Sequence, residues 1–121
     1  ICWFKPGSTR RNDTGGFNEW EPILFYGKNK FQQDVKRLPD VANHSLESGD
    51  HPCPKPIRLF TWLLEQTQSI TILDPFMGSG TTGVAVVKAG RRFVGVEIEP
   101  VYFEIACRRI DDAQRQERLI A

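Results

Sequence analysis

Several residue types that bind ligands stand close together in the run DPFMGSGTTG, residues 74–83. An acidic side chain comes first, then the Gly-Ser-Gly turn 78–80, then two threonines. Glycines after a strand let the backbone pass close to a ligand. The first N–H groups of a following helix, with the positive end of its dipole, favour an anionic or strongly polar group. We therefore expect a ligand to bind at this turn.

Two phosphate-binding patterns fit this run less well. A P-loop needs Gly-Lys-Ser/Thr, but Thr81 follows Gly80 here, and no lysine is present. Residues 78–83 formally match the dinucleotide pattern G-x-G-x-x-G, which is weak when it stands alone. Asp74 ahead of the glycines would also repel a pyrophosphate. A nucleotide-binding oxidoreductase fragment is therefore the weaker alternative.

A second acid narrows the choice of ligand. Glu97 ends the run RFVGVE, roughly 20 residues after the turn, where an acidic residue takes ribose hydroxyls. An amino group near Asp74 and a ribose near Glu97 together describe S-adenosylmethionine, which is cationic and has no pyrophosphate. Taken singly, Asp74 could form a turn, Glu97 could be solvated and Phe76 could belong to the core.

The elements around this run alternate between helix and strand. Strands are predicted at 70–73 and 92–98, and a helix at 82–89 that Gly90 ends. Helical spacing of apolar residues predicts one helix from residue 57 and another from Pro100. The order from residue 51 onward indicates a β-α-β unit in a parallel sheet.

The first half of the chain carries weaker signals. Strands are predicted at 1–4 and 21–26, a loop at 7–18, and an irregular connector at 28–50. The opening residues ICWF read as the middle of a strand, so we expect the chain to be a piece of something longer.

The composition excludes few classes of protein. With 121 residues, 40% hydrophobic, 26% charged and a net charge of +1, the chain fits one soluble domain at most. The charge neither demands nor excludes a nucleic acid. Three widely spaced cysteines indicate a reducing cytoplasm, and no apolar run could span a bilayer. The spacing of His44, His51 and Cys53 matches no zinc pattern.

Two motifs carry a family resemblance. LDPFMGSGTTGVAVVKAGRRFVGVEIEP and HPCPKP closely resemble elements of the β-class amino-methyltransferases of DNA, in which the catalytic half precedes the cofactor half. ICWFKP and NEWEPILFYGK are similar to strands that follow the catalytic half in that class. The resemblance covers nearly the whole chain. It implies an α/β, Rossmann-like S-adenosylmethionine-dependent methyltransferase fold.

The resemblance also implies roles for single residues. Those that would surround the methionine part and the sulfonium of S-adenosylmethionine are Asp74, Phe76, Gly78, Ser79, Gly80, Thr81 and Thr82. Glu97 would hold both ribose hydroxyls, and Ile98 would pack on the adenine. His51 and Lys55 would reach the methionine carboxylate, although Lys55 could instead be a solvated lysine.

One part of the family pattern is missing. The catalytic tetrapeptide, which is Asp, Asn or Ser followed by Pro-Pro and an aromatic, does not occur in this sequence. We expect it upstream of residue 1. The leading hypothesis is the C-terminal, cofactor-binding portion of an enzyme that methylates adenine N6, the favoured target, or cytosine N4. The alternative is a non-catalytic remnant that binds only cofactor or a partner.

The family's sheet order, 3-2-1-4-5-7-6, implies how the chain is organised. Residues 51–121 would form the cofactor-binding part, with strands 1 and 2. Residues 1–50 would supply strands 6 and 7 and the loops on the target-recognition side of the same domain. The central strands 4 and 5, and strand 3, are missing, so we expect a partner in a missing N-terminal catalytic half or in a dimer.

Basic side chains divide into two predicted groups. Those in or beside the polar loops could contact the backbone of double-stranded DNA, and they are Arg10, Arg11, Lys28, Lys30, Lys36 and Arg37. Ordinary solvated side chains are an equal alternative for them. The pairs Arg91-Arg92 and Arg108-Arg109 are predicted to lie at solvated ends and faces of their elements.

Overall fold

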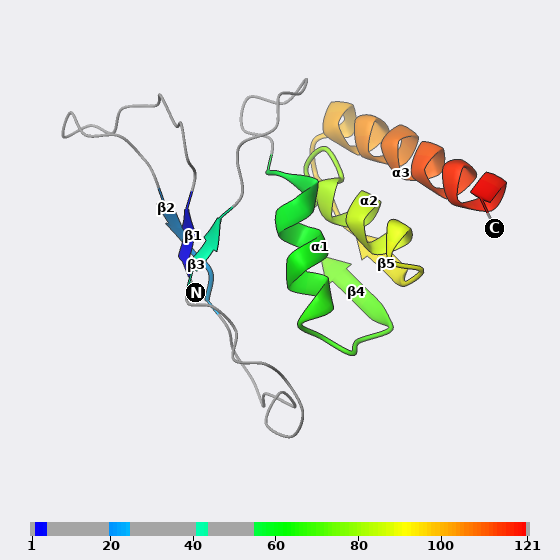
Figure 1. Ribbon diagram of the computed structural model, residues 1–121. Coiled ribbons are helices and arrows are strands. Elements are labelled where there is room, and N and C mark those ends of the chain that lie inside the picture. The colour runs from blue at the N-terminus through cyan, green and yellow to red at the C-terminus, as the bar shows by residue number, and fades with distance from the viewer. Residues whose placement is uncertain (1, 5–19, 25–40, 44–54, 121) are drawn as a thin grey trace. The chain divides into compact units, whose positions relative to one another are not determined.

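The computed structural model describes residues 2–4, 20–24, 41–43 and 55–120 (Figure 1). The chain divides into two compact units, Ile1–Glu47 and Ser48–Ala121. Every residue predicted for the cofactor site falls in the second unit, and all but His51 lie within the described ranges.

The first unit contains a small three-stranded sheet in the order β2-β1-β3. Strand β1 (Cys2–Phe4) pairs antiparallel with β2 (Trp20–Pro22) and parallel with β3 (Val41–Asn43). The two predicted strands are therefore present, in shorter form. The prediction of an irregular connector is wrong at β3, because three residues are too few to show a period and only their pairing with β1 makes them a strand.

The second unit alternates helix and strand as predicted. It contains α1 (Ile57–Glu65), β4 (Thr71–Asp74), α2 (Thr81–Lys88), β5 (Arg92–Gly95) and α3 (Pro100–Ile120). Strands β4 and β5 pair in parallel, with Leu73 opposite Val94. The sheet register and the helix between the strands confirm the predicted β-α-β unit.

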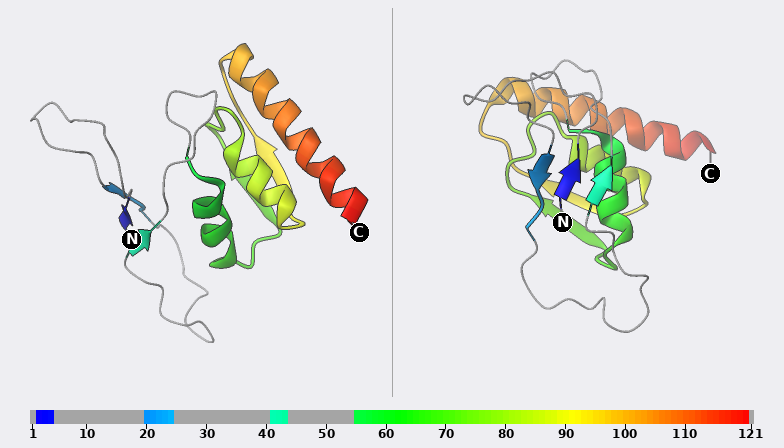
Figure 2. Two further views of the ribbon diagram at one scale, coloured as in Figure 1. Left: turned by 45° about the horizontal axis from the view of Figure 1, so that its top comes forward. Right: turned by 60° about the vertical axis from the view of Figure 1, so that its left-hand side comes forward.

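Helix α2 is the centre of this unit and contacts α1, α3, β4 and β5. Its small side chains allow close packing, and a Cβ at Gly83 would collide with Ile110 and Phe93. Val86 and Ala85 are completely or almost completely buried, and Ile72 and Phe93 pack against them from the sheet. Figure 2 shows α2 between the other two helices.

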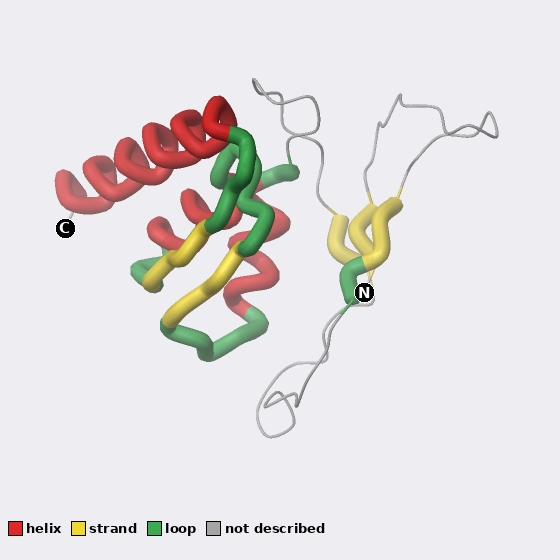
Figure 3. The backbone as a smooth tube through the Cα atoms, turned by 180° about the vertical axis from the view of Figure 1, so that it is seen from behind, coloured by secondary structure: helices red, strands yellow, loops and turns green. Residues whose placement is uncertain are grey.

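The opposite face of β4 and β5 is apolar and exposed. Along each strand the side chains alternate, so that Ile72 and Phe93 face the helices while Leu73, Val94 and Val96 point away. These three side chains are 62%, 52% and 53% exposed. Figure 3 shows both strands from this side, with the helices behind them.

Prolines and glycines set the helix boundaries. Pro56 precedes α1 with an extended backbone, and α3 begins at Pro100. Gly90 follows α2, as predicted, and it has a positive φ. Among the described residues, no helix is long and apolar enough to cross a membrane.

Candidate ligand-binding site at the loop between β4 and α2

The chain segments that leave β4 and β5 stay side by side beyond the strands. The Val96 N–H donates to the Asp74 carbonyl at 2.9 Å, and the Met77 N–H donates to the Val96 carbonyl at 3.0 Å. Ligands of open α/β sheets bind outside the carboxyl ends of the strands. The two predicted acids, Asp74 and Glu97, are therefore brought to the same end of the sheet.

Two glycines give the loop its path. Gly78 and Gly80 have φ angles of 52° and 79°, a region that other residues rarely adopt. A Cβ on Gly80 would lie 2.8 Å from the Cβ of Ala106 in α3, so the loop packs directly on that helix. At Gly78 no described atom lies within 4 Å of such a Cβ. The loop therefore packs against α3 at Gly80, whereas the described atoms leave space for a side chain at Gly78.

Glu97 ties the loop to the segment after β5. Its Oε2 accepts a hydrogen bond from the Gly78 N–H at 2.8 Å, and its Oε1 accepts one from the Glu99 N–H at 2.9 Å. These two backbone contacts hold the half-buried carboxylate in place beside the loop.

Asp74 has a local role in the structure. Its Oδ1 accepts a hydrogen bond from the Phe76 N–H at 3.0 Å, which is the turn-forming contact that its residue type allows. The Phe76 side chain is 87% exposed and Ile98 is 96% exposed, so neither belongs to the core of the described unit. Exposed apolar side chains beside two carboxylates suit a ligand with both polar and apolar parts.

The start of α2 also faces the loop. Gly80 occupies the capping position, and no side chain of the described part caps the helix. The first backbone N–H groups of a helix have no acceptor inside it. Thr81 and Thr82 are both buried here. A helix start of this kind favours a polar or anionic ligand group.

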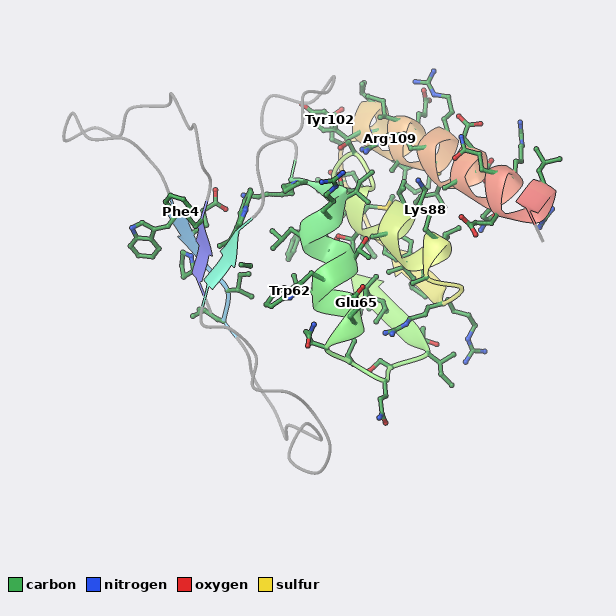
Figure 4. The ribbon with its side chains drawn as sticks, viewed as in Figure 1. Phe4, Trp62, Glu65, Lys88, Tyr102 and Arg109 are labelled. Atoms are coloured by element: carbon green, nitrogen blue, oxygen red, sulfur yellow. The ribbon has the colours of Figure 1, made fainter. Side chains whose placement is uncertain are left out.

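Arg109, in α3, reaches the same loop (Figure 4). The sequence did not reveal this contact. Arg109 Nη1 donates to the Ser79 carbonyl at 2.6 Å and to Ser79 Oγ at 2.9 Å, with Thr81 Oγ1 at 3.4 Å. The prediction that Arg109 lies on a solvated face is wrong, because the side chain is half-buried; Arg108 is exposed. Its spacing of three residues from Ala106 could have indicated the inward position.

The remaining predicted residues are placed only in part. Lys55 is half-buried and stands just before α1, while His51 lies outside the described residues. His44 and Cys53 lie outside them too. Within the described ranges, no group of three or more acidic, histidine or cysteine side chains could hold a metal ion.

A comparison of the sequence with models of protein families shows which family the chain belongs to. The model described as DNA methylase matches residues 1–108. The chain belongs to the DNA methylase family. The match includes both the loop between β4 and α2 and the segment that carries Glu97.

Curated relatives of this DNA methylase chain include bacterial methyltransferases. It is 44% identical over 82 residues to Type II methyltransferase M2.MboI of Moraxella bovis, across 66% of this chain and 30% of that protein. It is 34% identical over 90 residues to DNA adenine methyltransferase YhdJ of Escherichia coli K12, across 73% and 31%. The chain thus spans about a third of the length of these relatives.

A solved structure of the M1.HpyAVI–SAM complex is similar to this methylase chain. The TM-score is 0.62 and the identity 30%, over 90% of this chain and 59% of the other. The likeness shows part of the α/β fold of S-adenosylmethionine-dependent DNA methyltransferases, which agrees with the fold expected from the sequence.

Proposed function

We propose that this chain supplies the S-adenosylmethionine site of a DNA methyltransferase. The observation that carries the proposal is the hydrogen bond from the Gly78 N–H to Glu97, which holds a carboxylate against a glycine loop at the start of α2, where Gly80 provides no side-chain cap. That arrangement suits a ligand with a diol at one end and a charged amino acid at the other. The likeness to a methyltransferase solved with SAM supports it.

Each residue has a role in the proposed site. Glu97 accepts the ribose hydroxyls, and Ile98 packs on the adenine. Phe76 and the loop surround the methionine part, with Asp74 near its cationic groups. The residues proposed to reach the methionine carboxylate are His51 and Lys55, together with the first N–H groups of α2. The bound cofactor supplies an electrophilic methyl group, and this chain's residues bind and orient it.

The proposed substrate is an exocyclic amine in double-stranded DNA, with adenine N6 favoured over cytosine N4. The adenine assignment is supported by the likeness to a relative named DNA adenine methyltransferase. The sequence contains no Pro-Pro tetrapeptide of the catalytic type. We therefore assign the grip on the flipped base to residues beyond this chain, in the same protein or in a partner copy.

Calorimetric titration of the protein, as its gene encodes it, tests the choice of cofactor. S-adenosylmethionine should bind, while NAD under the same conditions should bind about tenfold more weakly or worse, because the Asp74 carboxylate ahead of the glycines would repel a pyrophosphate. Tighter binding of NAD would overturn the proposal and favour the oxidoreductase alternative.

A non-catalytic methyltransferase remnant is the second candidate, and the missing tetrapeptide favours it. Incubation with double-stranded DNA and S-adenosylmethionine labelled in its methyl group separates the two. Label recovered in N6-methyladenine supports the enzyme. Cofactor binding without any label in DNA would support the remnant.

A further inference from the structure

The peptide group between Ser79 and Gly80 is fixed at both of its polar atoms. Its carbonyl oxygen accepts from Arg109 Nη1, and its N–H donates to the Met77 carbonyl at 2.9 Å. Because a peptide group is planar, fixing both atoms fixes the orientation of the plane. The flanking glycines impose little conformational preference of their own. The orientation of this peptide therefore depends on the two hydrogen bonds.

The position of Arg109 is electrostatically unusual. A cation near the start of a helix is disfavoured by the helix dipole. Hydrogen bonds from a charged donor to Ser79 offset that cost. The stability of α2 alone gives no reason to keep a guanidinium there, whereas orientation of the loop and attraction of an anionic group at the same helix end do.

The contact to α3 is also tightly built. Gly80 approaches Ala106, and Arg109 lies one helical turn further along the same side of α3. From the segment after β5, Glu97 holds the Gly78 N–H. Glu97, after β5, and Arg109, in α3, thus hold two consecutive loop residues, Gly78 and Ser79.

We infer that Arg109 is a positioning residue of the cofactor site. It holds the Ser79–Gly80 peptide so that the first N–H groups of α2 are oriented before S-adenosylmethionine binds. The inference rests on the proposed function, and it assigns Arg109 no direct contact with the cofactor. Pre-organising a loop in this way raises affinity because less ordering remains to be done on binding.

The test compares variants at neighbouring positions of α3 in the protein as its gene encodes it. By titration calorimetry, Arg109→Met should raise the Kd for S-adenosylmethionine about tenfold or more, on the scale of a lost charged hydrogen bond. Arg108→Met, at an exposed position of the same helix, is the control and should bind like the wild type. Arg109→Lys should retain part of the affinity, because it keeps the charge without the planar fork.

Hydrogen exchange without cofactor separates positioning from general stability. In Arg109→Met the amides of residues 77–83 should exchange faster, while those of 57–65 and 84–88 keep their protection. If Arg109→Met does not fold, the lysine variant gives the same comparison with a smaller expected change.

Three results would overturn the inference. Wild-type affinity in the Arg109 variants would remove the positioning role and leave the proposed function intact. Weaker binding together with a loss of protection throughout the second unit would show a merely structural role. No binding of S-adenosylmethionine by the wild type would remove both the inference and the proposed function.

Discussion

At the residue scale, the two acids of the site differ in what the structure shows them doing. The Glu97 carboxylate joins segments 19 residues apart by its hydrogen bond to Gly78, whereas the hydrogen bond of the Asp74 carboxylate is with Phe76, two residues away. A turn-forming aspartate is common in loops. The placement of Glu97 is therefore the stronger support for a ligand site.

Substitution of Glu97 should weaken ligand binding. Glu97→Ala in the complete protein is expected to weaken S-adenosylmethionine binding tenfold or more, because a charged acceptor is lost and the loop is released. The matched control is Glu99→Ala, since that exposed residue offers its backbone N–H, which alanine keeps. Calorimetric titration measures both. Equal affinities in the two variants would remove the ribose role from Glu97.

The two loop glycines should respond differently to a methyl group. Both have a positive φ, which costs alanine roughly 1–2 kcal/mol. Gly80→Ala must also displace Ala106, at 2.8 Å, while Gly78→Ala meets no described atom. Urea unfolding should therefore show a larger loss of stability for Gly80→Ala than for Gly78→Ala. The opposite order would contradict the close packing of the loop on α3.

At the element scale, α2 holds the site by packing between α1, α3 and both strands. It is only eight residues long, and a helix of that length is not stable alone in water. Its position beside the loop therefore depends on this packing, which buries the helix from its first turn to Val86. Loss of core packing around α2 should therefore lower stability and ligand binding together.

A pair of valines tests this dependence. Val86 in α2 is completely buried, while Val101 in α3 is 61% exposed. Val86→Ala should lower the free energy of unfolding by about 2 kcal/mol, since it removes buried methyl groups and leaves a cavity. Val101→Ala should change it by less than about 0.5 kcal/mol. Urea denaturation measures both, and similar losses would place Val86 outside the core.

At the scale of the whole molecule, the exposed face of β4 and β5 is the notable feature. Leu73, Val94 and Val96 form an apolar surface on a parallel pair, and parallel sheets are normally covered on both faces. The chain spans about a third of the length of the curated relatives M2.MboI and YhdJ. We predict that a catalytic half or a second copy of the chain covers this face.

A substitution on that face tests the prediction in the protein as its gene encodes it. If the face is covered, Leu73→Ser should lower stability by about 2 kcal/mol or more, because a polar group replaces a buried apolar one. Val101→Ser, at an exposed helix position, should lower it by less than half as much. Sedimentation at several concentrations distinguishes a second copy from the same chain. A change at Leu73 no larger than at Val101 would leave the face solvated.

The sequence determined the features that depend on neighbouring residues. Glycines at 78, 80 and 90, and prolines at 56 and 100, dictated the turns and helix ends, because they restrict or free the backbone locally. Alternation and helical spacing then predicted the β-α-β unit. Asp74 and Glu97 were predicted to bind a ligand because each lies at the end of one of two predicted parallel strands.

Only the tertiary structure decided the contacts between distant elements. Strand β3 exists through its pairing with β1, and Arg109 meets Ser79 across 30 residues of sequence. The sequence does not show whether an arginine on a helix faces water or a neighbouring loop. Its direction here was settled by the close approach of Gly80 to Ala106, which depends on how α3 packs against α2.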